Sequence, residues 1–213
     1  MNAFGPMVHR SARTGGILLA VGSIQFIAAM IIVQLKYPGY TDFGNYVSDL
    51  GNTSTSPWYW LFNDSIRLLA VLGILGTILI RSAYPRKTFA RGGLLFLFIA
   101  ELAAFAVGTF PENVNGGIHD TVSSITFIAA GLALLLLGVG TFRDTRWEGY
   151  RGYTFLSGVV TFIGIALFQS NPGNGAFVGL WERIIIAPIL VWAILAGLHL
   201  VRLPAFAPAK PVT

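Results

Sequence analysis

Six long apolar stretches, separated by short polar connections, constrain this chain more than any other feature of its sequence. A helix needs roughly 20 consecutive apolar residues to cross the hydrocarbon core of a bilayer. Within that core, only helices and closed barrels satisfy every backbone hydrogen bond. The sequence therefore predicts an all-α, polytopic membrane protein whose six transmembrane helices form one bundle. The expected spans cover about 15–35, 60–80, 92–110, 117–141, 153–169 and 177–201.

The composition agrees with this class and narrows it. Of the 213 residues, 54% are hydrophobic and 11% are charged, and the mean hydropathy is +0.70. Charged residues make up about a quarter of a typical soluble domain. The length predicts a single six-helix domain over residues 1–213, ending in a flexible tail at 202–213 that contains three prolines. The absence of cysteine excludes disulfides and thiolate nucleophiles, and nothing in the sequence identifies a cofactor.

The positive charges flank the apolar stretches and lie almost entirely on one side of them. Because cytoplasmic connections are enriched in Lys and Arg, this bias predicts cytoplasmic termini in a multi-pass protein of the cell membrane. The expected partners are membrane lipids rather than nucleic acid, and the oligomeric state stays open. Only Lys36 falls on the outward side, whereas eleven residues fall on the other: Arg10, Arg13, Arg81, Arg86, Lys87, Arg91, Arg143, Arg146, Arg151, Arg202 and Lys210.

This orientation can be tested with single cysteines, since the chain contains none of its own. We expect an impermeant thiol reagent to label Asn113→Cys in intact cells, because Asn113 lies in a connection predicted to face outward. Lys87→Cys, in a connection on the opposite side, should react only after permeabilisation. The reverse labelling pattern would overturn the predicted orientation.

The densest group of polar residues in the chain lies between the third and fourth spans. The stretch Phe110–Ser124 reads FPENVNGGIHDTVSS, so one helix ends near Pro111 and the next opens with His119 and Asp120. His119 and Ser123 are four residues apart and therefore share a helix face. We expect this stretch, together with Glu112, to form the mouth of an outward-facing polar site.

Several charged residues lie inside the predicted spans, where each costs on the order of 2.5–3.5 kcal/mol if it faces lipid. Arg67 and Glu101 lie at comparable depths, so we expect Arg67 to pair with Glu101 or with another buried carboxylate. Asp64 shares a helix face with Arg67, and Glu182 lies next to Arg183 on the last span. The prediction is that one pocket of a few hundred Å³ gathers His119, Asp120, Asp64, Arg67, Glu182 and Arg183, with Glu101 as its floor.

Such a mixture of acids and arginines suits a zwitterionic or phosphate-bearing lipid headgroup, or another small polar ligand. The connection 36–59 is rich in Tyr, Phe and Trp, so we expect it to lie on the bilayer surface as a lid. A purely structural interpretation stands beside this one. Carboxylates at helix N-termini are favoured by about 0.3–1 kcal/mol without any function, and His119 can act as a capping residue.

Two further functions use the same residues. An intramembrane hydrolase or transferase acting on lipids would use His119, Asp120 and Ser123 as catalytic residues, with or without a metal held by His119 and nearby carboxylates. An ion-coupled or proton-coupled transporter would use Glu101 and Arg67 instead. The inner halves of the spans are almost wholly apolar, which argues against transport.

Three short motifs resemble a known family. They are Ser48-Asp49-Leu50-Gly51, Phe110-Pro111 followed by His119-Asp120, and Glu182-Arg183-Ile184, in this order along nearly the whole chain. The chain resembles the six-span prokaryotic membrane proteins catalogued as domain of unknown function 998, which implies a six-helix fold but no established activity. A more distant likeness is to metal-dependent lipid hydrolases of the alkaline ceramidase type, whose further histidines near the mouth this chain lacks.

Overall fold

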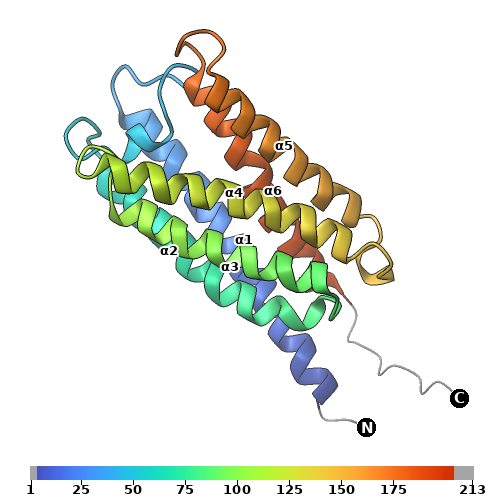
Figure 1. Cartoon of the computed structure of the whole chain (residues 1–213). Helices are drawn as coiled ribbons and strands as arrows, with labels where there is room; N and C mark the ends of the chain where they lie inside the picture. Colours follow the sequence, from blue (N-terminus) through green and yellow to red (C-terminus); the bar gives the residue numbers. More distant parts are fainter. Residues whose placement is uncertain (1–3, 204–213) are drawn as a thin grey trace, which may run out of the picture.

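The computed structural model describes residues 4–203 and consists of six long helices joined by shorter connections (Figure 1). All six are long and apolar enough to cross a membrane, and no strand occurs between residues 4 and 203. The predicted fold class, an all-α polytopic bundle of six helices, is confirmed. The helices are α1 (Phe4–Lys36), α2 (Tyr59–Ile80), α3 (Thr88–Thr109), α4 (Gly116–Gly140), α5 (Arg151–Ser170) and α6 (Val178–Arg202).

The first helix is longer than predicted, and most of the predicted C-terminal tail lies beyond the described residues. Helix α1 begins at Phe4, well before the expected start near residue 15. Hydropathy marks only the part of a helix that suits hydrocarbon, whereas backbone hydrogen bonding continues beyond that part. The flexible tail predicted at 202–213 lies, from residue 204 onward, outside the described residues.

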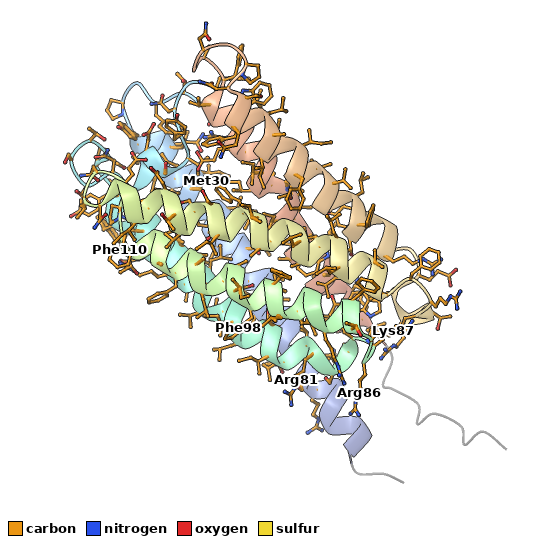
Figure 2. All side chains as sticks on the ribbon, viewed as in Figure 1. Met30, Arg81, Arg86, Lys87, Phe98 and Phe110 are labelled. Carbon is orange, nitrogen blue, oxygen red and sulfur yellow. The ribbon has the colours of Figure 1, made fainter. Side chains whose placement is uncertain are left out.

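The six helices form a closed ring. Each helix packs against its neighbours in sequence, and α6 returns to pack against α1. Short connections favour such antiparallel neighbours. Figure 1 shows the connections after α1, α3 and α5 at one end of the bundle, and the beginning of α1 and the end of α6 at the other. We call these the outer and inner ends, following the charge bias that Figure 2 illustrates with Arg81, Arg86 and Lys87 at the inner end and Phe110 at the outer end.

Two glycines allow the ring to close between α1 and α6. A side-chain carbon added at Gly16 would lie 2.7 Å from the carbonyl oxygen of Gly197, and one added at Gly197 would overlap the carbonyl oxygen of Gly16. The two backbones are therefore in direct contact, as small residues permit between membrane helices. This contact brings the first and last helices together although they are distant in sequence.

The inner end of the ring is filled by large side chains. Trp147 is buried and stacks on Tyr84, with ring centroids 4.3 Å apart, and its indole N–H donates to the Ala83 carbonyl at 3.2 Å. Leu134, Leu137 and Leu200 are buried in the same cluster. The bundle is thus densely packed toward the inner end, which leaves the outer half as the place for a cavity.

Residues 37–58, here called the outer loop, fold into the outer end of the ring. Leu50 in the short helix η1 (Ser48–Gly51) is 0% exposed, and Val47 before it is also buried against α1 and α2. The sequence did not predict that Leu50 and Val47 enter the ring, and the position of this segment at the bilayer surface stays a prediction. The ring leaves an opening at this end, and burying two apolar side chains there stabilises the fold by about 1.5–3 kcal/mol each. Exposed aromatics at the rim of the loop include Phe43, Tyr46 and Trp58.

Candidate ligand-binding cavity

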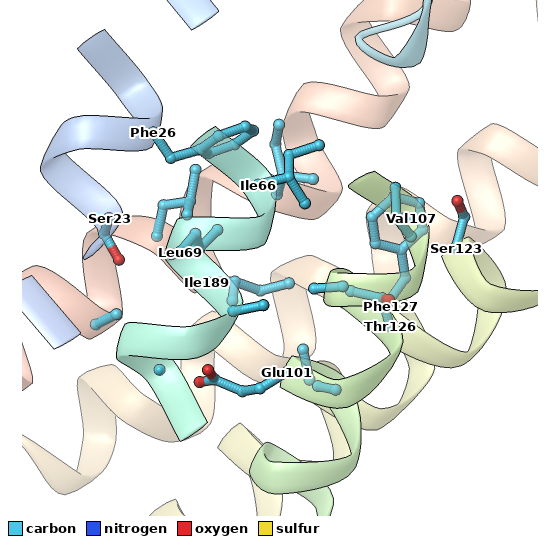
Figure 3. Close-up of a pocket in the computed structure, with 18 of the residues that line it drawn as sticks. Ser23, Phe26, Ile66, Leu69, Glu101, Val107, Ser123, Thr126, Phe127 and Ile189 are labelled. Carbon is cyan, nitrogen blue, oxygen red and sulfur yellow. The ribbon is translucent and has the colours of Figure 1, made fainter. Parts of the chain in front are cut away.

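A cavity of about 140 Å³ lies inside the ring beneath the outer loop (Figure 3). Its walls come from α1, α2, α3, α4 and α6, and Val47 and Ser48 of the outer loop contribute to its lining. Most of the lining side chains are aliphatic or aromatic, among them Phe26, Ile66 and Ile189. The polar side chains that line the cavity are Ser23, Ser48, Glu101, His119, Ser123, Thr126 and Glu182.

Glu101 on α3 lines the cavity and directs its carboxyl group toward α2, as Figure 3 shows. Its Oε2 atom is buried and has no hydrogen-bond partner in the described part of the chain. The carboxyl group rests on the backbone of Gly73, where an added side-chain carbon would overlap both carboxylate oxygens and their carbon. The missing side chain of Gly73 therefore creates the space that Glu101 occupies.

His119 lies in the first turn of α4 and is buried at the outer part of the cavity. Its Nδ1 atom is 2.9 Å from the carbonyl oxygen of Phe110, the residue directly after the end of α3. A carbonyl oxygen only accepts hydrogen bonds, so in the neutral ring Nδ1 carries the proton and Nε2 stays available as an acceptor. The side chain thus ties the α3–α4 turn together and still offers one nitrogen to a ligand.

Glu182 in the first turns of α6 is buried and joins the cavity to the outer loop. Its Oε2 atom accepts a hydrogen bond of 2.6 Å from the backbone N–H of Val47. The same side chain lines the cavity. Glu182 therefore holds the loop in place with one oxygen and contributes to the polar outer end of the cavity.

Arg183 faces the outer loop rather than the cavity. Its guanidinium donates to the Tyr40 hydroxyl at 2.9 Å and to the Asp42 carbonyl and carboxylate at 2.8 and 2.9 Å. Tyr40 in turn donates to the Tyr46 carbonyl at 2.9 Å, and its burial raises its pKa to about 12 despite the nearby cation. This network anchors the loop on α6.

Glu112 connects the α3–α4 turn to the outer loop. It accepts hydrogen bonds from the Ser48 hydroxyl at 2.7 Å and from the Asn52 amide at 3.4 Å. Burial raises the pKa of Glu112 above 4.5 and the neighbouring carboxylate of Asp49 raises it further, while the bonds from Ser48 and Asn52 partly oppose the shift. The carboxyl groups of Glu112 and Asp49 thus meet at the point where the loop closes over the turn.

A pH dependence of stability follows from this contact. Because the folded pKa of Glu112 is raised, its contribution to stability is present at pH values below about 4.5 and is lost as the pH rises through the folded pKa. We expect the melting temperature in detergent to fall over this pH range and the Glu112→Gln variant to show a smaller fall. Glu148→Gln, an exposed change at the inner end, serves as the matched control. Identical pH profiles for Glu112→Gln and the wild type would contradict the prediction.

The structure pairs Arg67 differently from the prediction. Arg67 forms an ion pair with Asp64 on its own helix and donates to the Gly108 carbonyl at 3.1 Å. The Asp64 side chain is 59% exposed, so the expected pairing with Glu101 or another buried carboxylate is wrong. Gly73, against which Glu101 rests, is six residues from Arg67 and therefore about 120° away from it around the helix axis. The two charges therefore occupy different faces of the bundle.

Asp120 also lies apart from the cavity. Consecutive residues of a helix are about 100° apart, so the burial of His119 leaves Asp120 exposed on the outside of α4. There Asp120, Thr121 and Ser124 border a shallow groove between α3 and α4. Within residues 10–203, no hydrogen bond joins His119 to Asp120 or to Ser123, and no group of three or more His, Cys, Asp or Glu is arranged to hold a metal ion.

The predicted site residues therefore separate into three groups. The expected convergence of six polar residues on one pocket is wrong: among the predicted residues, the cavity gathers Glu101, His119, Ser123 and Glu182. Glu112 and Arg183 hold the outer loop, and Asp64, Arg67 and Asp120 lie on the outside. The prediction missed Gly73 and Ser23, since neither carries a charge that marks it within an apolar helix.

Together these features describe a polytopic membrane protein, a closed ring of six helices around a cavity that a folded loop covers. Residues 20–199 match the family model described as Protein of unknown function (DUF998), and the chain belongs to this family. The family resemblance predicted from the three sequence motifs is thereby confirmed. Neither a curated protein nor a solved structure matches the chain.

Proposed function

We propose that this protein binds a small amphiphilic molecule in the cavity beneath the outer loop. The observation that carries the proposal is the distribution of polarity: aliphatic and aromatic walls lead to polar groups near the loop, among them Ser48, His119 and Glu182. Ligand sites commonly combine a mostly apolar lining with a few placed polar groups. We further propose that the protein resides in the cell membrane, with the loop on its outer face.

The size of the cavity limits the ligand. A cavity of about 140 Å³ is close to the roughly 150 Å³ that holds one benzene molecule in an engineered apolar core. A ligand of about six to ten non-hydrogen atoms fits this space, whereas a whole phospholipid does not. The bound molecule would therefore be a small compound, or the end of a larger one whose remainder stays outside.

The charges of the cavity limit the ligand further. Its lining in the described part of the chain contains the carboxyl groups of Glu101 and Glu182 but no Lys or Arg. The arginines that would hold a phosphate, Arg67 and Arg183, are engaged elsewhere. Hydrogen-bond acceptors favour a ligand that donates hydrogen bonds, such as an alcohol or an amine, over an anionic headgroup.

Binding can be tested with three probes of one shape, benzyl alcohol, benzylamine and benzoate, added to the protein in nanodiscs. We expect saturable stabilisation by benzyl alcohol and benzylamine with a Kd on the order of 1 mM or tighter, and none by benzoate. Ala104→Leu places three extra carbons in the cavity lining and should weaken binding at least tenfold.

The matched control is Ala106→Leu, an identical substitution on the same helix at a residue that does not line the cavity. This variant should bind the probes as the wild type does. The proposed function would be overturned if no probe gave saturable binding, or if both leucine variants bound equally well.

A further inference from the structure

We propose that Glu101 makes the cavity selective for amines, and that binding of a protonated amine releases one proton from the Glu101 carboxyl group to water. The inference rests on the proposed function, because it assigns the ligand class and the recognition group of the same cavity. Glu101 has a buried carboxylate oxygen that no hydrogen bond satisfies in the described part of the chain.

No contact of Glu101 with the described residues explains why a carboxyl group stands at this position. Glu101 lies eight residues before Thr109, the end of α3, and so about 12 Å along the helix from its outer end. The buried Oε2 atom accepts no hydrogen bond in the described part of the chain, although buried polar atoms nearly always have a partner. Gly73 leaves room for the carboxyl group on α2. An acceptor that the fold accommodates but does not satisfy indicates a partner from outside the chain.

The neighbours of Glu101 do not compensate a negative charge. In the described part of the chain, the ionisable groups that share the cavity are His119 on α4 and Glu182 on α6, both near its outer end, and no Lys or Arg lines it there. Trp192 lines the cavity too, but its indole N–H donates to the Thr154 hydroxyl at 3.0 Å. The other lining groups do not ionise, and they include Ser23 from α1, Gly73 from α2, Thr126 from α4 and Ile189 from α6.

The proton balance follows from these surroundings. An unpaired charge in an apolar cavity is costly, so the empty site holds Glu101 as the neutral acid. An alkylamine is an ammonium ion in neutral water, as a lysine side chain is. When it binds, the carboxyl group loses its proton to water and the resulting carboxylate accepts charge-assisted hydrogen bonds from the ammonium group. The complex therefore contains one ammonium group and one carboxylate. It holds one proton fewer than the free protein and the free ammonium ion together.

The same cavity does not suit a bare metal cation. Hard cations such as Ca²⁺ and Mg²⁺ take about six to eight oxygen ligands. The lining is mostly aliphatic side chains with the glycine backbone beside Glu101, and its hydroxyl groups, Ser23, Ser48, Ser123 and Thr126, come from α1, the outer loop and α4. An organic amine needs fewer oxygens and buries its hydrocarbon part against the apolar walls, which favours binding.

The test measures binding and proton release together, using the full chain in nanodiscs with benzylamine and benzyl alcohol as probes. We expect the affinity for benzylamine to rise with pH, by up to about tenfold for each pH unit while Glu101 is the neutral acid and the amine is protonated, because the complex holds one proton fewer. Calorimetry in buffers of different ionisation enthalpy should report about one proton released for each benzylamine bound. Benzyl alcohol should bind with a pH-independent affinity and release no proton.

Two variants locate this coupling at Glu101. Glu101→Gln keeps the shape of the side chain and should bind benzylamine at least tenfold more weakly, without proton release, while its affinity for benzyl alcohol is retained. Gly73→Ala displaces the carboxyl group by steric overlap and should act in the same direction. Gly152→Ala, in open space at the start of α5, is the matched control and should leave both affinities unchanged.

The outcomes separate the two proposals. Benzylamine binding without proton release, or with the same affinity in Glu101→Gln as in the wild type, would overturn the role of Glu101 and leave the cavity as an amphiphile site. Failure of both probes to bind the wild type would overturn the proposed function as well. The proton count comes from the wild-type protein, so the test does not depend on the folding of a variant.

Discussion

Replacing Arg183 with leucine is expected to raise the hydrogen-exchange rates of protected amides in the outer loop by about a hundredfold. Arg183 makes three hydrogen bonds from α6 to this loop, one to the Tyr40 hydroxyl and two to Asp42. Its guanidinium also lies 5.7 Å from the centroid of the Tyr40 ring. A hydrogen bond from a charged group contributes about 1.5–3 kcal/mol. Because the Asp42 side chain is 54% exposed, we discount its ion pair and expect a total near 3 kcal/mol.

The exchange experiment monitors backbone amides that are hydrogen-bonded within the outer loop. Asn45 donates to the Thr41 carbonyl and Leu50 to the Val47 carbonyl, at 3.1 and 3.2 Å. Arg67→Leu is the matched control, since this arginine also lies near the outer end of its helix but pairs with α2 and α3. Unchanged exchange in Arg183→Leu, or an equal increase in both variants, would show that Arg183 does not anchor the loop.

This prediction bears on function because the outer loop covers the cavity. Val47 and Ser48 line the cavity and are bonded to Glu182 and Glu112. Opening of the loop would expose the outer, polar part of the cavity to water. A variant that opens the loop more often should therefore exchange a bound probe faster, while the contacts within the cavity stay the same.

The second large effect is expected at the contact between α1 and α6. Gly197→Leu should destabilise the folded bundle by roughly 3 kcal/mol, the upper part of the usual range for overpacking. The added side chain would begin where the Gly16 carbonyl oxygen already lies, and a backbone atom cannot move aside without separating the helices. For a protein of about 200 residues, this corresponds to a drop in melting temperature on the order of 10 °C.

Gly152→Leu provides the matched control for this substitution. Gly152 is also helical, but a side chain there would enter open space. Leucine has a higher helix propensity than glycine by about 0.8 kcal/mol, so this control should keep or slightly raise the melting temperature. Equal melting temperatures for Gly197→Leu and the wild type would show that the two backbones are farther apart than in this structure.

The candidate site could be predicted from the sequence only in part. A buried charge stands out in an apolar stretch, so Glu101, His119 and Glu182 were predicted as site residues, and all of them line the cavity. Depth along a helix was predictable as well, since each residue advances it by about 1.5 Å. The direction in which each side chain points was not predictable. Arg67 and Asp120 lie at suitable depths but on other helix faces.

Local sequence alone determined the six-helix membrane class. In hydrocarbon, every backbone N–H and C=O group must be hydrogen-bonded within the protein, and a single long apolar stretch achieves this by forming a helix. The family was also readable from short motifs, and the match over residues 20–199 confirms it. Tertiary structure alone decided the ring, the buried outer loop and the cavity. These depend on contacts between residues distant in sequence, such as Gly16 with Gly197, Val47 with Glu182 and Gly73 with Glu101. A helix span is set by the preference of its own residues for hydrocarbon, whereas a cavity is set by which helix faces meet, and no single stretch of sequence carries that information.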